Sequence, residues 1–278
     1  MSGQRTVSRH RTVAAQTLLL AAGACAAAAL TSDAATANTA SAYGPQTATA
    51  ALTPTAALAV PAPTANGVRE ISSAYNSGYL ASACCGRTDA GGSFTAVSGT
   101  FNVPRLVAPA DGVAVELAVG LQGTNENGKL IEAGVGVYWD GTTEAWWDTA
   151  ATSLRRPITL PINRGDRITI TIERARGGGS SIRLVDHTIG LGFTTRQRYG
   201  ANGDQAFWLV RDQPVLRGGA VARFAPKVSF TNLRISTPNG ELRRIAQRNQ
   251  AGVPILTPSA IRSTGFTVSY RAATPAAQ

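Results

Sequence analysis

The sequence is poor in the residues on which most metal centres and many reactive sites depend. Its 278 residues include three cysteines, two histidines, one methionine and only two lysines, and aromatic residues make up 6%. No spacing of Cys and His fits a metal-ligand set, so we expect no metal ion and no other cofactor. His10 lies near the N-terminus, and His187 stands alone within Val185-Asp186-His187-Thr188, which predicts a turn residue and not a catalytic base.

Long apolar runs are also lacking. After residue 30 no apolar stretch reaches membrane-spanning length, so we expect no stable membrane insertion. With 44% hydrophobic and 15% charged residues, the chain is not an acidic disordered chain, a coiled coil or a collagen-like repeat. Its net charge of +10 comes mostly from arginines that are scattered along the sequence, which predicts no nucleic-acid partner.

The N-terminal region has the layout of a secretory signal. Three arginines within the first eleven residues precede an apolar stretch from Thr17 to Leu30, and small residues follow at Ala35-Thr36-Ala37. A positive start, an apolar middle and a small-residue exit predict a signal peptide over residues 1–37 and an extracellular protein. Lipidation at Cys25 is the weaker alternative, because no leucine stands three residues before it.

A linker separates this signal from the folded domain. Residues 38–66 are Ala, Thr and Pro with almost no charge, the composition of a flexible linker or a short pro-segment. The folded domain then spans residues 67–278, a normal size for one all-β domain, and we expect it to be a monomer. Cys84 and Cys85 are adjacent, so a strained ring, an intermolecular disulfide and free thiols all remain open.

From residue 94 onward the apolar residues recur with a period of two. The alternation is clearest over residues 113–121, 168–172 and 266–270, and turn signals rich in Gly, Asn and Asp separate such segments. This pattern predicts about ten to twelve short strands packed as an antiparallel β-sandwich. Residues 241–250 are a candidate for one short helix.

The segment from Leu130 to Trp139 has two unlike faces. One face is apolar throughout, whereas the other carries Glu132 beside Gly134 and Gly136. The missing glycine side chains would leave room for a ligand backbone over the sheet. Alternatively, Glu132 faces water and the glycines mark a bend or bulge, and the residues alone do not decide between these interpretations.

Two aromatic pairs follow at Tyr138-Trp139 and Trp146-Trp147. On facing strands they could line a groove for a peptide or a sugar. Packing in the core is the commoner role for Trp at strand spacing, so both interpretations stay open here.

A series of short segments follows in a fixed order over about residues 74–236. They are Asn76-Ser77-Gly78-Tyr79, residues 94–104, Val119-Gly120-Leu121-Gln122-Gly123, residues 130–135, Ala145-Trp146-Trp147-Asp148, Gly165-Asp166-Arg167-Ile168, Ala206-Phe207-Trp208-Leu209-Val210, Phe224-Ala225 and residues 228–232. In order and spacing these segments resemble the motifs of the glutamic peptidases, the eqolisins.

The resemblance implies a fold and a mechanism. It implies a secreted β-sandwich of two curved antiparallel sheets, with a substrate cleft across the concave sheet. In that family a Glu acts as general base on water and a Gln amide binds the developing oxyanion, without a metal or a covalent intermediate.

At the catalytic positions this sequence departs from the family pattern. The family Gln falls on Glu132 and the family Glu falls on Phe207, while the acid of the aromatic strand is kept only as Asp148. The Trp of the first motif falls on Ser77, and the Asp of the turn motif falls on Gln122. Phe207 cannot accept a proton, and an ionised Glu132 cannot donate a hydrogen bond to an oxyanion. The departures predict impaired hydrolysis.

Two functions from different classes therefore remain. In the first, the cleft binds an extended peptide or a cell-wall glycan, with Tyr138, Trp146, Trp147, Asp148 and Trp208 as implied contacts. Removal of residues 1–37 takes away three arginines and one aspartate and leaves a charge of +8, which favours acidic partners such as anionic cell-wall polymers.

In the second, the chain is an acid-acting endopeptidase with a rearranged acid–amide pair. Glu132 would be the base, and Gln122 or Gln205 would supply the amide. Gln205 is two residues from Phe207 and hence on the same strand face, about 6–7 Å along the strand.

Overall fold

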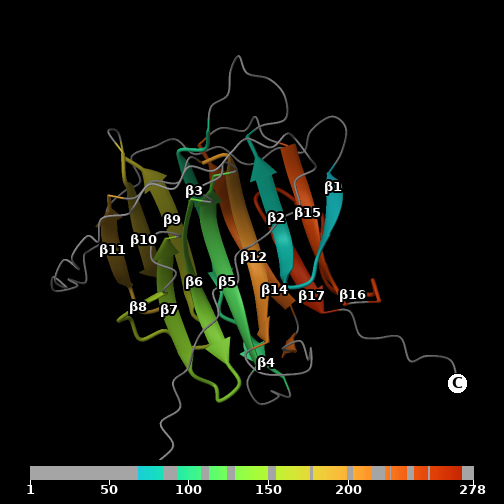
Figure 1. Cartoon of the computed structure of the whole chain (residues 1–278). Coiled ribbons are helices and arrows are strands. Elements are labelled where there is room, and N and C mark those ends of the chain that lie inside the picture. The colour runs from blue at the N-terminus through green and yellow to red at the C-terminus, as the bar shows by residue number, and fades with distance from the viewer. Residues whose placement is uncertain are drawn as a thin grey trace, which may run out of the picture. The chain divides into compact units, whose positions relative to one another are not determined.

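The protein is described by a computed structural model (Figure 1). It describes residues 68–83, 93–107, 113–123, 129–149, 155–175, 178–198, 203–214, 223–225, 227–236, 241–249 and 251–270. These residues belong to one compact unit, Gln46–Gln278. The predicted signal peptide, the predicted linker and the Cys84–Cys85 pair lie outside the described residues.

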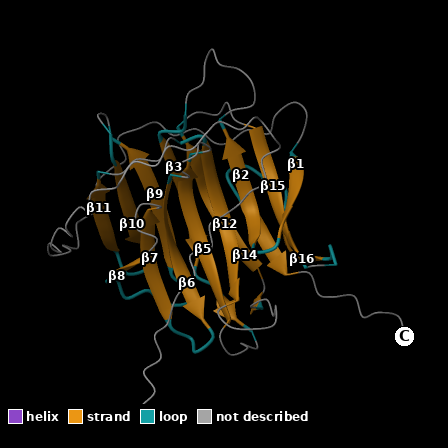
Figure 2. Ribbon diagram, in the orientation of Figure 1, coloured by secondary structure: helices purple, strands orange, loops and turns teal. Residues whose placement is uncertain are grey.

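Strands make up the regular structure of the described ranges, which confirms the all-β prediction (Figure 2). They are β1 (Arg69–Ser73), β2 (Asn76–Ser82), β3 (Ala96–Asn102), β4 (Arg105–Leu106), β5 (Val113–Gln122), β6 (Leu130–Tyr138), β7 (Thr143–Thr149), β8 (Arg156–Ile158), β9 (Arg167–Arg174), β10 (Ser180–Asp186), β11 (Leu191–Gln197), β12 (Gln205–Pro214), β13 (Phe224–Ala225), β14 (Lys227–Ile235), β15 (Glu241–Arg248), β16 (Pro254–Pro258) and β17 (Phe266–Tyr270). The strands exceed the ten to twelve predicted, because pieces as short as β4, β8 and β13 carry no readable alternation. Within the described ranges, no helix is long and apolar enough to cross a bilayer.

Strands β4 and β13 pair as a separate two-stranded sheet, and the other strands form two stacked layers of one continuous, curved sheet (Figure 1). The front sheet has the order β8-β7-β6-β5-β12-β2-β15, and the back sheet has the order β16-β17-β14-β3-β9-β10-β11. The antiparallel β15–β16 pair joins the two sheets, and β1 adds to β15 in parallel. Contacts of β3 and β9 with β5 show that the sheets pack face to face. The predicted antiparallel sandwich is confirmed.

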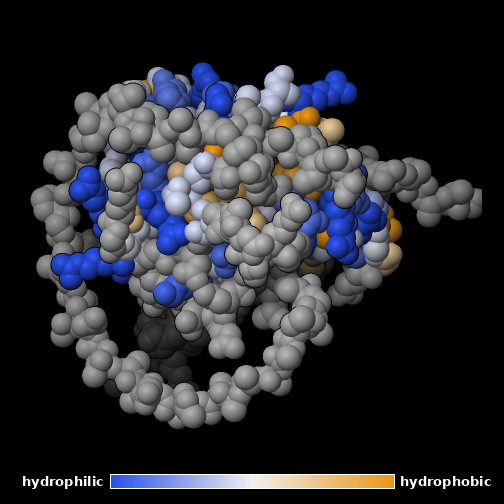
Figure 3. Space-filling model, turned by 90° about the horizontal axis from the view of Figure 1, so that it is seen from above, coloured by the Kyte–Doolittle hydropathy of each residue, from blue (hydrophilic) through white to orange (hydrophobic). Residues whose placement is uncertain are grey.

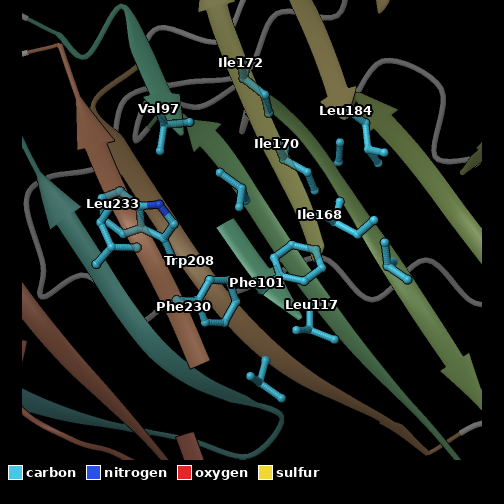
Figure 4. Close-up of a cluster of buried hydrophobic side chains, with 14 of the residues drawn as sticks. Val97, Phe101, Leu117, Ile168, Ile170, Ile172, Leu184, Trp208, Phe230 and Leu233 are labelled. Carbon is cyan, nitrogen blue, oxygen red and sulfur yellow. The ribbon is translucent and has the colours of Figure 1, made fainter. Parts of the chain in front are cut away.

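The hydrophobic core lies between the two sheets (Figure 4). Leu117 and Trp208 enter it from the front sheet, and Phe101, Ile170 and Phe230 enter it from the back sheet. The rings of Phe101 and Phe230 meet edge to face with their centroids 5.5 Å apart. Strand positions that alternate with these core residues therefore face away from the core on both sheets.

The helix considered for residues 241–250 is wrong, because residues 241–248 form strand β15. This strand pairs with β2 on one side and with β1 and β16 on the other. Leu242 and Ile245 are both buried although they point to opposite faces, Leu242 into the core and Ile245 beside Gly78 on the outer face. Burial on both faces removes the alternation by which a strand is read from sequence.

Two carboxyl groups interact where β9 begins and β10 ends. Asp166 and Asp186 are both buried, and each accepts a backbone N–H, from Asn163 at 2.6 Å and from Thr188 at 2.8 Å. Burial raises the pKa of the Asp186 carboxyl above its usual range; the Thr188 N–H opposes this shift, and the charge of Asp166 reinforces it. The folded protein therefore holds a proton here more tightly than the unfolded chain does.

This pair predicts a pH-dependent contribution to stability. Because the folded pKa of Asp186 is raised, its contribution is fully present below the unfolded carboxyl pKa of about 3.9 and is lost as pH rises through the folded value. Asp186→Asn mimics the protonated acid. We therefore expect its free energy of unfolding to fall less between pH 3 and pH 7 than that of the parent protein. Urea unfolding at each pH measures this. A difference between the two proteins that does not change with pH would contradict the prediction.

Candidate functional site

The positions that the resemblance singles out lie on the front sheet in one cross-strand row. Phe207 of β12 pairs with Gly120 of β5, Gly120 pairs with Glu132 of β6, and Glu132 pairs with Asp148 of β7. All four share the face turned away from the core, which we call the cleft face. Phe207 and Glu132 are two strands apart, about 9–10 Å between their backbones.

Gly120 is required because the Phe207 ring lies over it. A Cβ atom at Gly120 would stand 2.2 Å from Cζ of Phe207, which no side chain permits. The ring thus reaches across β5 toward Glu132, and Phe207 is completely buried. The row places an apolar ring beside a carboxylate, and a phenyl ring cannot accept or donate a proton.

Arg211 occupies the space beside Glu132. Its Nη1 donates a hydrogen bond to Oε1 of Glu132 at 2.8 Å, and its Nη2 lies 2.6 Å from Oε2. The backbone of Arg211 lies in another row, opposite Glu116, so its side chain crosses the row of Ala118 and Gly134 to reach the carboxylate. The contact is made at two points, and Glu132 is only 3% exposed.

A second ion pair lies next to the first. Nη2 of Arg155 donates to Oε2 of Glu116 at 2.6 Å, and Nη1 of Arg155 contacts the other oxygen. The Arg155 guanidinium also stands 4.2 Å from the ring centre of Trp146, a cation–π contact. Burial, and secondarily the charge of Arg211, lowers the pKa of Arg155 to about 10. Two carboxylates and two guanidiniums thus balance within one cluster, buried except for the half-buried Arg155, which we call the charge cluster.

Sequence reasoning missed both arginines, although a signal for one was present. Arg211 falls on the same alternating face of β12 as Gln205 and Phe207, so a period-two reading would have placed it on the cleft face. Its contact with Glu132 depends on the register of three strands, which the sequence does not reveal. Arg155 precedes the short strand β8, which carried no pattern.

The structure separates the aromatic residues that the sequence grouped. Trp146 lies on the cleft face, where a Cβ at Gly134 would meet its Cζ2 at 2.6 Å. Trp147 and Trp208 lie on the core face, as the core interpretation predicted, whereas Trp146 lies on the cleft face but is only 1% exposed. The Nε1 of Trp208 donates to the carbonyl of Ser98 in the back sheet at 2.8 Å. Trp147 and Trp208 therefore belong to the core and not to the cleft face.

Two further predicted residues, Tyr138 and Asp148, also lie on the cleft face. Tyr138 is half-buried and donates its hydroxyl to Oε2 of Glu144 at 2.9 Å. Burial, reinforced by Glu144, raises the pKa of that hydroxyl, so it stays protonated. Asp148 is half-buried directly opposite Glu132.

The two candidate amides lie side by side. Gln205 and Gln122 are direct cross-strand partners in the row next to that of Glu132. Both are half-buried, and Oε1 of Gln122 has no hydrogen-bond partner among the described residues. The geometry therefore supplies amides near Glu132, but both oxygens of that carboxylate are turned to Arg211.

Other buried polar atoms on the cleft face also lack partners in the described part of the chain. They include Oδ1 of Asn76, Oγ of Ser82, Nε1 of Trp146 and Nε of Arg211, as well as Oε2 of Glu132, which Nη2 of Arg211 approaches to 2.6 Å as an ion pair without hydrogen-bond geometry. Buried polar groups are normally hydrogen-bonded, so a cluster of unsatisfied donors and acceptors suits a ligand rich in both. No group of three or more His, Cys, Asp or Glu residues in the described ranges could hold a metal ion.

The Glu132–Arg211 pair predicts strong coupling between the two residues. Arg211→Met strands a buried carboxylate, and we expect it to destabilise the protein by roughly 3–5 kcal/mol. Glu132→Gln combined with Arg211→Met should recover most of that loss, because both buried charges are removed. Denaturant unfolding of the single and double variants gives the coupling, with Arg196→Met on an exposed strand position as control. Additive effects would show that the pair does not form.

Solved structures of glutamic peptidases share the fold. Scytalidoglutamic peptidase, solved with a peptide-based transition-state analogue, is 20% identical over 71% of this chain and 98% of its own, with a TM-score of 0.58. SCP-B, described as an eqolisin family member in complex with the tripeptide Ala-Ile-His, is 19% identical over 71% of this chain and 98% of its own, with a TM-score of 0.56. No sequence among the curated proteins matches this chain.

The family model for the peptidase A4 family matches residues 82–270. This range contains the row from Phe207 to Asp148, the charge cluster and both candidate amides. The match covers well over half of the chain and agrees with the resemblance seen in the sequence motifs. The protein therefore belongs to the peptidase A4 family, the glutamic peptidases.

Proposed function

We propose that this protein is a family member that binds an extended peptide on its cleft face and is impaired in hydrolysing it. The observation that carries this proposal is the two-point contact of Arg211 with Glu132 beside a completely buried Phe207. These residues stand where the resemblance expects an amide and a general base. Neither residue, so held, activates water.

The expected loss of rate is large. Removal of one oxyanion donor typically costs on the order of 10²–10³ in rate. Removal of a general base typically costs about another 10²–10⁴, although losses within one catalytic unit do not multiply cleanly. Either loss alone would leave little activity.

Retained features of the cleft face support peptide binding. The rings of Phe207 and Trp146 lie over Gly120 and Gly134, and the amides of Gln122 and Gln205 stand partly exposed beside them. The unsatisfied Nε1 of Trp146 and Oε1 of Gln122 offer one donor and one acceptor. A peptide backbone carries both kinds of group in every residue other than proline.

We further propose that the protein is exported and acts outside the cell as a monomer. The support is the signal-like layout of residues 1–37 and the uncharged composition of residues 38–66. The remaining charge of +8 favours acidic partners over basic ones.

One observation favours an acid-acting endopeptidase as the second candidate. Gln122 and Gln205 lie on the same face as Glu132, and Asp148 stands opposite it, so an acid–amide pair is within reach. This activity would require Glu132 to leave Arg211. We therefore rank it below peptide binding.

We expect the parent protein not to cleave a denatured protein between pH 2 and pH 6, and a triple variant to gain cleavage. The variant Glu132→Gln, Phe207→Glu, Arg211→Met restores the amide and the base. It also removes the Arg211 guanidinium, which lies 5.4 Å from the Phe207 ring centre and would otherwise bind the new carboxylate. Peptide release measures the activity. The matched control, Glu132→Gln, Phe207→Gln, Arg211→Met, should stay inactive because it lacks a base.

Cleavage by the parent protein that Glu132→Ala abolishes would establish the endopeptidase and sink the binding-only proposal. An inactive triple variant that nonetheless unfolds cooperatively would show that more than the catalytic pair has been lost.

Peptide binding is tested separately with end-blocked decapeptides of mixed sequence. We expect Gln122→Ala with Gln205→Ala to weaken binding of the decapeptides that the parent protein binds about tenfold, because roughly one hydrogen bond is lost at each position. Isothermal titration measures the affinity, and Gln197→Ala on back-sheet strand β11 is the control. Equal binding by all three proteins, or no binding to the parent, would refute a peptide site on the cleft face.

A further inference from the structure

One end of the sandwich gathers turns from both sheets. In the front sheet the pairings bring together the ends of β1, β6, β12 and β15 and the starts of β2 and β5. In the back sheet they bring together the ends of β3, β10 and β17 and the starts of β9, β11, β14 and β16. The β15–β16 turn joins the two sheets there. We call this the basal end, and β4 and the β6–β7 turn mark it at the bottom of Figure 1.

The large apolar side chains that are exposed in the described part of the chain all lie at the basal end. Each stands in a turn or at a strand terminus and is between 39% and 50% exposed. They are Tyr75, Val107, Trp139, Ile189, Leu191 and Val253. In the view from above, onto the opposite end, hydrophilic residues gather on the periphery of the molecule (Figure 3). The basal end therefore presents apolar tips that the described residues of the opposite end lack.

Exposed cations surround these tips. They are Arg105, Arg164, Arg167, Arg223 and Lys227. Two of them have partners, since Arg164 interacts with the charge of Asp140 and the Arg223 guanidinium stands 5.5 Å from the ring centre of Tyr270. The side chains of Arg105, Arg167 and Lys227 form no ion pair with any described residue. Their charges are therefore available to a partner.

Exposed negative charge is scarce at the same end. Among its described residues, Asp140 is the exposed carboxylate. Asp166 and Asp186 are buried, and Glu144 is half-buried where it accepts the hydroxyl of Tyr138. The excess of cations gives the basal end a positive potential, which attracts anionic headgroups.

We propose that the basal end docks on the surface of a lipid bilayer that contains anionic lipids. The apolar tips come from separate turns with polar residues between them. A protein partner would need a continuous apolar centre, whereas a bilayer surface accepts each tip separately to a shallow depth. Trp and Tyr, here Trp139 and Tyr75, are the side chains that gather at bilayer interfaces. The cleft face lies on the side of the front sheet, so docking leaves it accessible and does not depend on what it binds.

Trp139 gives a local readout of docking. It is 45% exposed, whereas the other three tryptophans, Trp146, Trp147 and Trp208, are at most 5% exposed. The full chain is mixed with vesicles of equal parts phosphatidylcholine and phosphatidylglycerol whose acyl chains are brominated. We expect these vesicles to quench the emission of the parent protein. Trp139→Phe should bind them about equally and show no quenching.

Binding of the parent protein without quenching would show that another segment holds the vesicle, for example the apolar residues 17–30, and would overturn the proposal.

A charge-matched pair of variants places the site. Arg105→Gln with Lys227→Gln should weaken vesicle binding about tenfold and reduce its dependence on salt, because both cations lie near the headgroups. Arg69→Gln with Arg198→Gln removes the same charge at exposed positions of the opposite end and should change binding less than about twofold. Sedimentation with the vesicles measures the affinity.

The apolar contribution is tested at two other turns. Ile189→Ser with Val253→Ser should weaken binding about fivefold or more and leave the salt dependence unchanged, because these side chains carry no charge. Urea unfolding checks that each variant is folded, and where one is not, the quenching of the parent protein decides alone.

Equal weakening by both charge variants, equal binding to vesicles of phosphatidylcholine alone, or no binding to either vesicle would overturn the proposal. So would a second copy of the chain as the occupant. In that case sedimentation equilibrium without lipid would show a dimer that Ile189→Ser with Val253→Ser dissociates.

Discussion

The contact between Arg211 and Glu132 is the constraint on which the cleft face depends. A carboxylate that is only 3% exposed needs a countercharge, and the guanidinium supplies it at two points. To make that contact, the arginine side chain crosses from its own cross-strand row past the row of Ala118 and Gly134. It also commits Glu132 to a structural partner, so the carboxylate is not offered to water.

The neighbouring residues follow from the same constraint. The Phe207 ring fills the space above Gly120, and the Arg211 guanidinium stands 5.4 Å from its ring centre. The Glu116–Arg155 pair completes a cluster of balanced charge, with Arg155 against Trp146. The glutamic-peptidase fold is thus retained, with a cluster of two ion pairs on its cleft face.

Much of the fold was readable from sequence, because strands with one buried face alternate. The segments over residues 113–121, 168–172 and 266–270 became β5, β9 and β17. Strand β15 was not readable, since Leu242 and Ile245 are buried on opposite faces and leave no period of two.

The site was readable only in part for a related reason. Alternation placed Glu132, Gln205 and Phe207 on definite faces of their strands, but it did not say which strands are neighbours or in which register. Arg211 reaches Glu132 across two strand pairings, β12–β5 and β5–β6, and such a contact is a property of the folded sheet. The assignment of Trp208 to the cleft came from the resemblance alone, and its strand parity places it in the core.

The most direct test of the central claim is a crystal structure at a resolution that shows ordered water. Our account predicts both Nη atoms of Arg211 within hydrogen-bond distance of the Glu132 carboxylate, the Phe207 ring over Gly120, and no water held jointly by Glu132 and a side-chain amide. A water bridging Glu132 to Gln122 or Gln205, with Arg211 turned away, would contradict it.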